Sequence, residues 1–221
     1  MVTQAAEPVE QRLLIRGLDW DRYRRISEAL SGRHVRLTYD RGNLEFMTIS
    51  AAHANLSRLL AQFVIVLTEA FGLPRRSFGD MTCDREDLDR GLEPDECFYI
   101  TNEPAVRGRD EIDLETVPPP DLMIEIDLSP PGRKRPSIYA ALGVPEVWRY
   151  DGEALVAATL TSAGRYEPAE FSRCIPSLRP GDLGAFLARR NETDESSLVG
   201  EFRRWASSLA QAAGERGRTA E

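Results

Sequence analysis

A short apolar run bounded by prolines constrains the fold of this chain more than any other feature. Residues 120–127 read PDLMIEID, and two more prolines follow within four residues. A nearly continuous apolar run of this length is typical of a central strand that is covered on both faces. Because successive side chains on a strand point to opposite faces, Leu122, Ile124 and Ile126 are predicted to share one face and pack into the core. Glu125 then lies on the other face, in the middle of the strand.

A carboxylate in the middle of a buried strand is costly unless it is paired, hydrogen-bonded or bound to a cation. Residues 93–100, EPDECFYI, repeat the pattern and place Asp95 where a second strand begins. Two acids on neighbouring strands can converge on one divalent ion such as Mg²⁺ or Mn²⁺. Lys134 and Arg135 follow at the start of a short helical pattern and would supply positive charge beside a phosphate. The alternative is that Glu125 faces solvent or pairs with an arginine.

The remaining pattern predicts an α/β (α+β) fold with a mixed sheet flanked by helices. Strand, turn and capping signals give the following expected elements: a helix over 18–32, a hairpin over 34–48, a helix over 50–72, strands within 75–87, 91–100 and 120–127, a short helix over 135–143, strands within 144–160 and 163–172, and helices near 181–190 and 194–211.

The domain organisation follows from the same signals. Residues 1–12 are predicted to form a flexible N-terminal arm, and residues 13–190 a single domain. A C-terminal helix over 191–213 is expected to pack on that domain, and residues 214–221 are expected to be a frayed tail.

Composition limits the class of protein. The 221 residues include 42% hydrophobic and 29% charged residues, which is enough apolar surface for one sizeable core. No apolar run approaches the roughly 18 residues of a membrane span, so we expect a cytoplasmic protein without a membrane partner. Three widely spaced cysteines, Cys83, Cys97 and Cys174, are expected to be buried free thiols. The net charge of −8 weighs against tight general binding of DNA.

Four sequence words together resemble the bacterial family described as "putative restriction endonuclease", a former domain of unknown function within the PD-(D/E)XK nuclease superfamily. They are RLTYDRGNLEFM with His53 soon after, GLEPDECFYI, PPDLMIEIDLS and IYAALGVPEVWRYDG, in the family's order over roughly residues 35–155. The resemblance implies a restriction-endonuclease-like core in which a mixed central β-sheet is flanked by helices and the acids lie at its centre.

Site residues follow from the resemblance position by position. Asp95 matches the first aspartate of the family motif and Glu125 its glutamate, and the resemblance implies that both bind Mg²⁺ or Mn²⁺. Glu45 lies where such folds often contribute a further acid. The family pattern favours His53 facing the cleft, whereas a lone histidine near a helix start is more often a surface or capping residue.

The chain departs from the motif at its lysine. The motif has lysine two residues after the glutamate, and Asp127 stands there in this chain. Many family members carry a lysine on the following helix instead, four residues before the tyrosine that matches Tyr139. That position is Arg135, with Lys134 just before it. Arginine is a planar, permanently charged donor, so it can hold a phosphate but is a poor partner for a nucleophilic water.

The function expected from the resemblance is a metal-dependent DNA endonuclease, with Asp95 and Glu125 as metal ligands. Cutting both strands with one site per chain would favour a homodimer. Two alternatives stay open. The first is a catalytically degenerate nuclease fold that acts as a binding or regulatory module. The second is a scaffold in which Glu125 is salt-bridged to Arg135.

Overall fold

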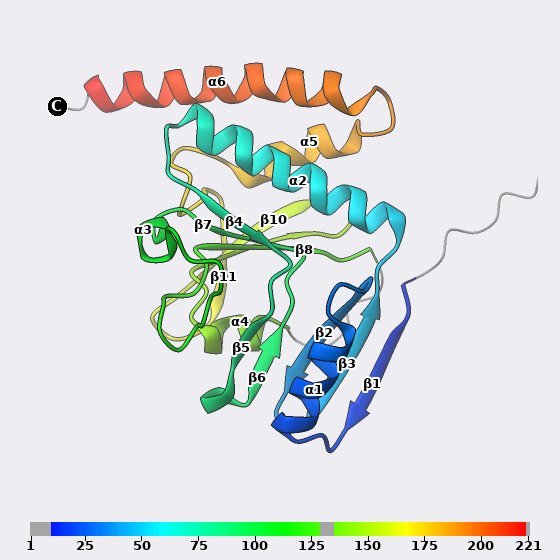
Figure 1. Cartoon of the computed structure of the whole chain (residues 1–221). Helices are drawn as coiled ribbons and strands as arrows, with labels where there is room; N and C mark the ends of the chain where they lie inside the picture. The colour runs from blue at the N-terminus through cyan, green and yellow to red at the C-terminus, as the bar shows by residue number, and fades with distance from the viewer. Residues whose placement is uncertain (1–9, 129–134, 220–221) are drawn as a thin grey trace, which may run out of the picture.

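The computed structural model describes residues 10–128 and 135–219, and Lys134 lies outside these ranges. Strands form two sheets, and helices cover them, which confirms the mixed α+β class (Figure 1). The sequence predicted a central mixed sheet, and the structure adds a smaller antiparallel sheet at one end of it.

The first sheet has five antiparallel strands in the order β1-β3-β2-β6-β5. Its strands are β1 (Arg12–Arg16), β2 (Val35–Asp40), β3 (Asn43–Thr48), β5 (Cys83–Arg85) and β6 (Arg90–Leu92). Helix α1 (Trp20–Leu30) packs on one face, where Tyr23 stacks on Tyr39 with ring centroids 4.5 Å apart. The other face of this sheet points toward the second sheet.

The second sheet has six strands in the order β4-β7-β8-β9-β10-β11. They are β4 (Arg76–Gly79), β7 (Glu96–Tyr99), β8 (Leu122–Ile126), β9 (Glu146–Tyr150), β10 (Leu155–Leu160) and β11 (Tyr166–Ala169). Strands β8 and β9 are parallel and all other neighbours are antiparallel. Helix α4 (Arg135–Leu142) lies in the connection between the two parallel strands, as a parallel pair requires a crossover.

Helices cover β8 on both faces, as its apolar run predicts. Helix α2 (Ala51–Ala70), helix α5 (Leu183–Ala188) and helix α6 (Glu195–Thr219) lie on one face, with α6 outermost (Figure 1). There Phe63 stacks on Phe202 with centroids 4.0 Å apart. On the opposite face, Met123 packs against Ile138 and Tyr139 of α4. The remaining helical turns are α3 (Glu103–Val106) and the 3-10 turns η1 (Glu86–Leu88) and η2 (Pro180–Asp182).

Local signals set the elements that carry two of the predicted site residues. The β2–β3 hairpin turns at Arg41 and Gly42, which both have positive φ (45° and 81°), as a tight hairpin turn requires. This turn fixes the register that places Glu45 opposite Thr38. Ser50 caps α2 by accepting a hydrogen bond from the His53 backbone N–H at 3.1 Å, as its position before the apolar run predicted.

The two chain ends differ from the prediction. Residues 10–12 are not loose, because strand β1 begins at Arg12 and the Gln11 N–H bonds Thr48 Oγ1 at 2.9 Å. Its run of apolar side chains does not alternate, so no local pattern indicated this strand. A frayed tail was expected over residues 214–221; α6 continues to Thr219, and residues 220–221 lie outside the described residues. A helix tolerates an exposed glycine such as Gly214 at a cost of about 1 kcal/mol.

Helix α2 is, by length and composition, long and apolar enough to cross a membrane, which the sequence analysis did not anticipate. Of its apolar stretch, 56% is buried inside the fold. The core helix of a soluble protein passes the same test, and α2 packs against α6 and β8. The three cysteines are free and buried, as predicted.

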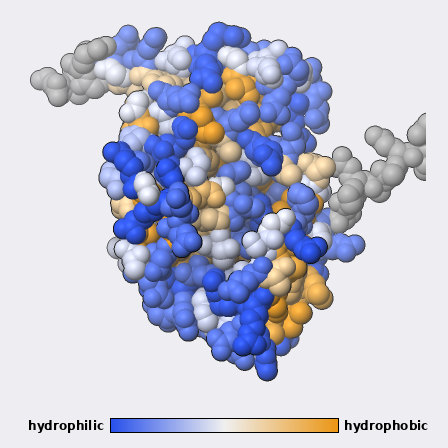
Figure 2. Space-filling view, viewed as in Figure 1, coloured by the Kyte–Doolittle hydropathy of each residue, from blue (hydrophilic) through white to orange (hydrophobic). Residues whose placement is uncertain are grey.

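Strand β1 is an edge of the first sheet and carries exposed apolar side chains. Leu13 is 60% exposed, and Leu14 and Ile15 are each 37% exposed. Figure 2 shows apolar colour gathered at the lower right, where Figure 1 places β1, on an otherwise largely hydrophilic face.

Candidate active site between the two sheets

Asp95 and Glu125 occupy facing positions on neighbouring strands of the second sheet. Glu96 of β7 pairs with Ile124 of β8, so the antiparallel register carries Asp95 opposite Glu125. The Asp95 backbone N–H bonds Ile124 O at 3.1 Å, and the Ile126 N–H bonds Asp95 Oδ2 at 2.7 Å. Facing residues of an antiparallel pair project on the same side of the sheet. The two acids therefore leave the sheet together, at the end that faces the first sheet.

Arg135 is paired with Glu125. It donates from Nη1 to Glu125 Oε2, and from Nε and Nη2 to Thr38 Oγ1 at 3.1 and 3.0 Å. Its guanidinium therefore joins β8 of one sheet to β2 of the other. Burial raises the pKa of Glu125 to about 8, because the charge of Arg135 only partly offsets desolvation and the nearby Asp95 and Asp127.

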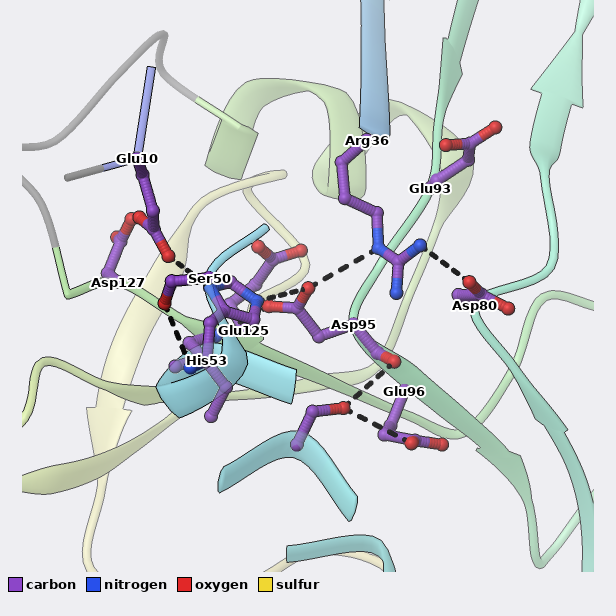
Figure 3. Close-up of polar contacts among 12 residues, drawn as sticks. Glu10, Arg36, Ser50, His53, Asp80, Glu93, Asp95, Glu96, Glu125 and Asp127 are labelled. Carbon is purple, nitrogen blue, oxygen red and sulfur yellow. Dashed lines mark hydrogen bonds and ion pairs between the residues drawn. The ribbon is translucent and has the colours of Figure 1, made fainter. Parts of the chain in front are cut away.

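His53 is buried and lies between two carboxylates (Figure 3). Its Nε2 lies 2.7 Å from Asp95 Oδ1, and its Nδ1 lies 2.5 Å from Glu10 Oε1. Burial lowers the pKa of His53, but the hydrogen bonds of Asp95 and Glu10 outweigh it and raise that pKa to about 9. Burial likewise acts to raise the pKa of Asp95, yet the contact with His53 leaves it below its usual value. The raised pKa of His53 favours the imidazolium form, and its charge in turn favours the carboxylate form of Asp95.

Arg36 of β2 lies on the far side of Asp95 from His53 (Figure 3). Its Nε is 3.4 Å from Asp95 Oδ1, and its Nη1 donates to Asp80 Oδ2 at 2.5 Å. Glu96, the next residue of β7, accepts from Ser57 at 3.2 Å, and burial raises its pKa to about 7. A polar cavity of about 920 Å³ opens beside these groups. Asp95 is buried but lies beside a polar, highly charged cavity.

Glu45 and Asp127 meet at Arg12 of β1 instead of at the two central acids. Arg12 Nη1 lies 3.0 Å from Glu45 Oε1, and Nη2 lies 3.3 Å from Asp127 Oδ1. Asp127, which stands at the position of the motif lysine, thus anchors the first sheet to the end of β8. Arg12 had no recognisable signal in the sequence, because its role depends on how the two sheets meet.

Comparison with known proteins places this chain in a family. The Uma2 family, described as "Putative restriction endonuclease", matches residues 20–183, which is most of the chain and includes the two facing acids. The chain belongs to the Uma2 family. The predicted family membership is therefore confirmed, and with it a nuclease-like assignment at the level of the family description.

Other comparisons add little to the Uma2 assignment. One similar solved structure is a crystal structure of a putative nuclease belonging to DUF820 from Anabaena variabilis ATCC 29413. It is 18% identical, covers 68% of this chain and 90% of its own, and has a TM-score of 0.44. A likeness this distant assigns no residue a role. No curated protein matches the chain.

The Uma2 chain has a second cavity, of about 510 Å³, on the α4 side of the second sheet. Glu125, Arg135 and Tyr139 line its inner end, and side chains of β9, β10 and β11 form its wall. Asp95 and Glu125 thus open onto different cavities, one polar and one largely apolar. Arg135 lies at the second one.

The site offers a divalent ion two carboxylates, those of Asp95 and Glu125. Within residues 10–128 and 135–219, no group of three or more His, Cys, Asp or Glu side chains is arranged to hold a metal ion. In that same part of the chain, however, Glu125 Oε1 is buried and has no hydrogen-bond partner. Asp95 Oδ2 accepts one N–H and keeps a second lone pair. Mg²⁺ is commonly bound through one or two carboxylates with several waters, so the pair fits such an ion.

Proposed function

We propose that this chain hydrolyses phosphodiester bonds of DNA, with Asp95 and Glu125 as the ligands of a Mg²⁺ or Mn²⁺ ion. One observation carries the proposal: two buried acids face each other across β7 and β8, and an oxygen of Glu125 lacks any partner among the described residues. The raised pKa of Glu125 supports the same proposal. It indicates that the surroundings of Glu125 supply too little positive charge to stabilise a buried carboxylate. A divalent ion would supply that charge.

Hydrolysis forms one P–O bond from water and breaks another, which releases a phosphomonoester and an alcohol. A bound metal would polarise the phosphate and lower the pKa of its water. His53 keeps Asp95 ionised and oriented through the 2.7 Å contact, and Glu10 fixes the imidazole from behind. Arg135 presents a permanent positive charge beside Glu125, suited to a phosphate oxygen.

The attacking water must also pass its proton to an acceptor. Arg135 cannot accept it, because a guanidinium stays protonated. Asp127, at the position of the motif lysine, is held by Arg12. Lys134, the remaining candidate from the sequence, lies outside the described residues. We propose that Arg135 binds phosphate, and that Lys134 is the residue to test for the lysine role.

Plasmid nicking with Mg²⁺ and with Mn²⁺ tests the proposal. Asp95→Asn and Glu125→Gln keep the side-chain shapes, and each is expected to lower the rate by at least about a hundredfold. Glu96→Gln is the matched control. Glu96 is the next acid along the chain from Asp95, but it accepts a hydrogen bond from Ser57 and is not a proposed metal ligand. Calorimetric titration with Mn²⁺ gives a readout independent of cleavage, and both site variants should lose binding. Nicking that survives both substitutions would overturn the assignment.

A second candidate is a nuclease fold that binds DNA without cutting it. The Arg135–Glu125 ion pair favours it, because a buried cation already neutralises much of the carboxylate. In that case DNA binding would persist without Mn²⁺ uptake, and Lys134→Ala would change neither. Restoring a lysine with Asp127→Lys separates the two candidates further, since only a metal-binding site would gain cleavage from it.

We propose a two-fold dimer for cleavage of both strands, with the exposed edge of β1 as the surface to test. Leu13 and Ile15 lie there with large exposed fractions. Sedimentation of the wild type and of Leu13→Glu, Ile15→Glu gives the answer directly: a dimer lost on substitution supports this edge, and a wild-type monomer excludes it.

A further inference from the structure

Two buried polar atoms without partners in the described part of the chain belong to residues that line the same cavity. Tyr139 is 1% exposed, and its hydroxyl has no hydrogen-bond partner in the described part of the chain. Glu125 Oε1 has none there either, and both residues line the cavity of about 510 Å³. A buried hydroxyl that bonds nothing costs about 1–3 kcal/mol, so chains rarely keep one without a use. Both residues therefore border the cavity with a polar atom that no other described group satisfies.

The wall of this cavity is an apolar sheet surface. Ala158 of β10 pairs with Val147 of β9 and with Pro168 of β11, so the three side chains form one row across the sheet. Val156 lies two residues before Ala158 on the same face and is 50% exposed. Tyr139 belongs to the cluster against which Val147 packs. The result is a largely apolar surface that also carries Arg149, the cross-strand partner of Val156.

Arginine side chains line the cavity near Glu125, and Arg135 and Arg12 among them are paired with acids. Arg135 and Arg12 line the cavity beside Glu125 and Asp127. Arg149 lines it too, and the register of β8 and β9 places it opposite Glu125. An anionic group that enters the cavity would therefore meet guanidinium groups close to the proposed metal site.

We propose that this cavity binds one unstacked nucleotide of the DNA strand, adjacent to the phosphate that is cut. The inference rests on the proposed function. A volume of about 510 Å³ lies within the usual range for small-molecule pockets, about 300–1,000 Å³. The apolar wall suits the face of a base, the Tyr139 hydroxyl suits a polar edge, and the exposed Arg149 suits the phosphate.

The pocket also selects a class of substrate. A base that is stacked and paired inside a duplex cannot enter a concave pocket without leaving the stack, which costs a few kcal/mol. Single-stranded or locally unpaired DNA avoids that cost. The net charge of −8 agrees with this reading, because a chain that tracks a long duplex needs many phosphate contacts. Single-stranded DNA is therefore the substrate that the cavity favours.

Fluorescence anisotropy with a short labelled single-stranded oligonucleotide tests the pocket. The titrations are run in EDTA and again in Ca²⁺, and the same strand annealed to its complement is the comparison. Ala158→Leu fills the cavity and is expected to weaken single-strand binding by at least about tenfold. Ala163→Leu makes the same change in the exposed β10–β11 turn, outside the cavity, and should leave binding unchanged.

Two further variants test the polar side chains that line the cavity. Tyr139→Phe removes only the hydroxyl and is expected to weaken binding by roughly two- to tenfold. Tyr99→Phe is its control, because the Tyr99 hydroxyl bonds Pro118 O at 2.9 Å, away from the cavity. Arg149→Gln should lower the dependence of affinity on salt by about one counterion.

The outcomes separate this inference from the proposed function. If the wild type nicks plasmid DNA while Ala158→Leu binds single strands as well as Ala163→Leu does, the pocket is wrong and the nuclease assignment stands. If Ala158→Leu and Tyr139→Phe weaken single-strand binding but no DNA is cut, the pocket stands and the nuclease assignment fails. A wild type that binds duplex at least as tightly as the single strand overturns the pocket.

Discussion

Arg135 of α4 donates to Glu125 of β8, and the same guanidinium bonds Thr38 of β2. One side chain thus pairs with the central acid of the larger sheet and also ties that sheet to the smaller one. The motif lysine would lie two residues beyond Glu125, where Asp127 bonds Arg12 instead. The cation of this site therefore comes from a helix, and it contributes to both stability and charge balance.

Arg135→Met should destabilise the protein in a pH-dependent way. Removing one partner of a buried ion pair costs about 3–5 kcal/mol when the other charge stays. Because the pKa of Glu125 is already near 8, its carboxyl is protonated at low pH and the loss is smaller there. Urea unfolding is therefore expected to show a larger loss at about pH 9 than at about pH 6.

Arg135→Met combined with Glu125→Gln is the control for this prediction. The double variant buries no unpaired charge, so its unfolding free energy should recover partly at about pH 9 and little at about pH 6. Equal losses at both pH values would mean that the bonds to Thr38 and the Glu93 carbonyl carry the effect, and not the charge of Glu125.

His53 should make the protein less stable as pH rises. Its pKa is raised to about 9 in the folded state, from an ordinary value of 6.5. A folded-state pKa above the unfolded one gives stability that is complete below about pH 6.5 and lost by about pH 9. The loss is expected to be about 3 kcal/mol, since each pKa unit corresponds to about 1.4 kcal/mol. Chemical unfolding in EDTA at several pH values measures it, and NMR titration of the imidazole gives the pKa directly.

His53→Gln isolates this contribution. The raised pKa values of Glu96 and Glu125 also lower stability as pH rises. Their effect cancels when the unfolding free energy of the variant is subtracted from that of the wild type. The difference should shrink between about pH 6.5 and about pH 9. Glu10→Gln should lower the pKa of His53 while Asp95 still raises it. A difference that stays constant with pH would contradict a buried imidazolium.

Much of the fold could be predicted because short-range signals decide it. The β2–β3 hairpin follows from its turn residues, and α2 follows from the Ser50 cap and a strong apolar period. The facing acids could be predicted too, because Glu125 interrupts an apolar strand that must be buried and Asp95 stands where a second apolar strand begins. In each case, the signal lies within about twenty residues of sequence.

The features that could not be predicted from the sequence depend on contacts between distant segments of the chain. Glu10 and Arg12 acquire their partners only when β1 pairs with β3, and a five-residue strand without alternation gives no local signal. The burial of His53 follows from Glu10 covering it, so its helix position alone favoured a surface residue. Thr38 reaches Arg135 only because the two sheets meet there. Sequence periodicity reports none of these contacts.

Gly91 should tolerate no side chain. A Cβ at this position would collide with the Asp84 carboxylate and the Tyr23 hydroxyl, which bond each other beneath α1. Gly91→Ala is therefore expected to lower the unfolding free energy by about 2 kcal/mol or more. Thermal unfolding followed by circular dichroism measures the change.

Gly214→Ala is the control with the opposite expected sign. Nothing lies within 4 Å of a Cβ at Gly214, and the residue is inside α6. Alanine should stabilise that helix by about 0.5–1 kcal/mol. A neutral result would mean that the helix ends before residue 214, as the sequence alone suggested.

Tyr139→Phe should leave the fold as stable as the wild type or slightly more stable. The Tyr139 hydroxyl is buried without a partner among the described residues, so its removal takes away a desolvation cost and no hydrogen bond. Tyr99→Phe removes a hydroxyl that bonds Pro118 O, and it should cost about 0.5–1.5 kcal/mol. Urea unfolding of the two variants side by side measures both changes. A loss at Tyr139 equal to that at Tyr99 would show that the fold itself satisfies this hydroxyl, and its availability to a ligand would then be excluded.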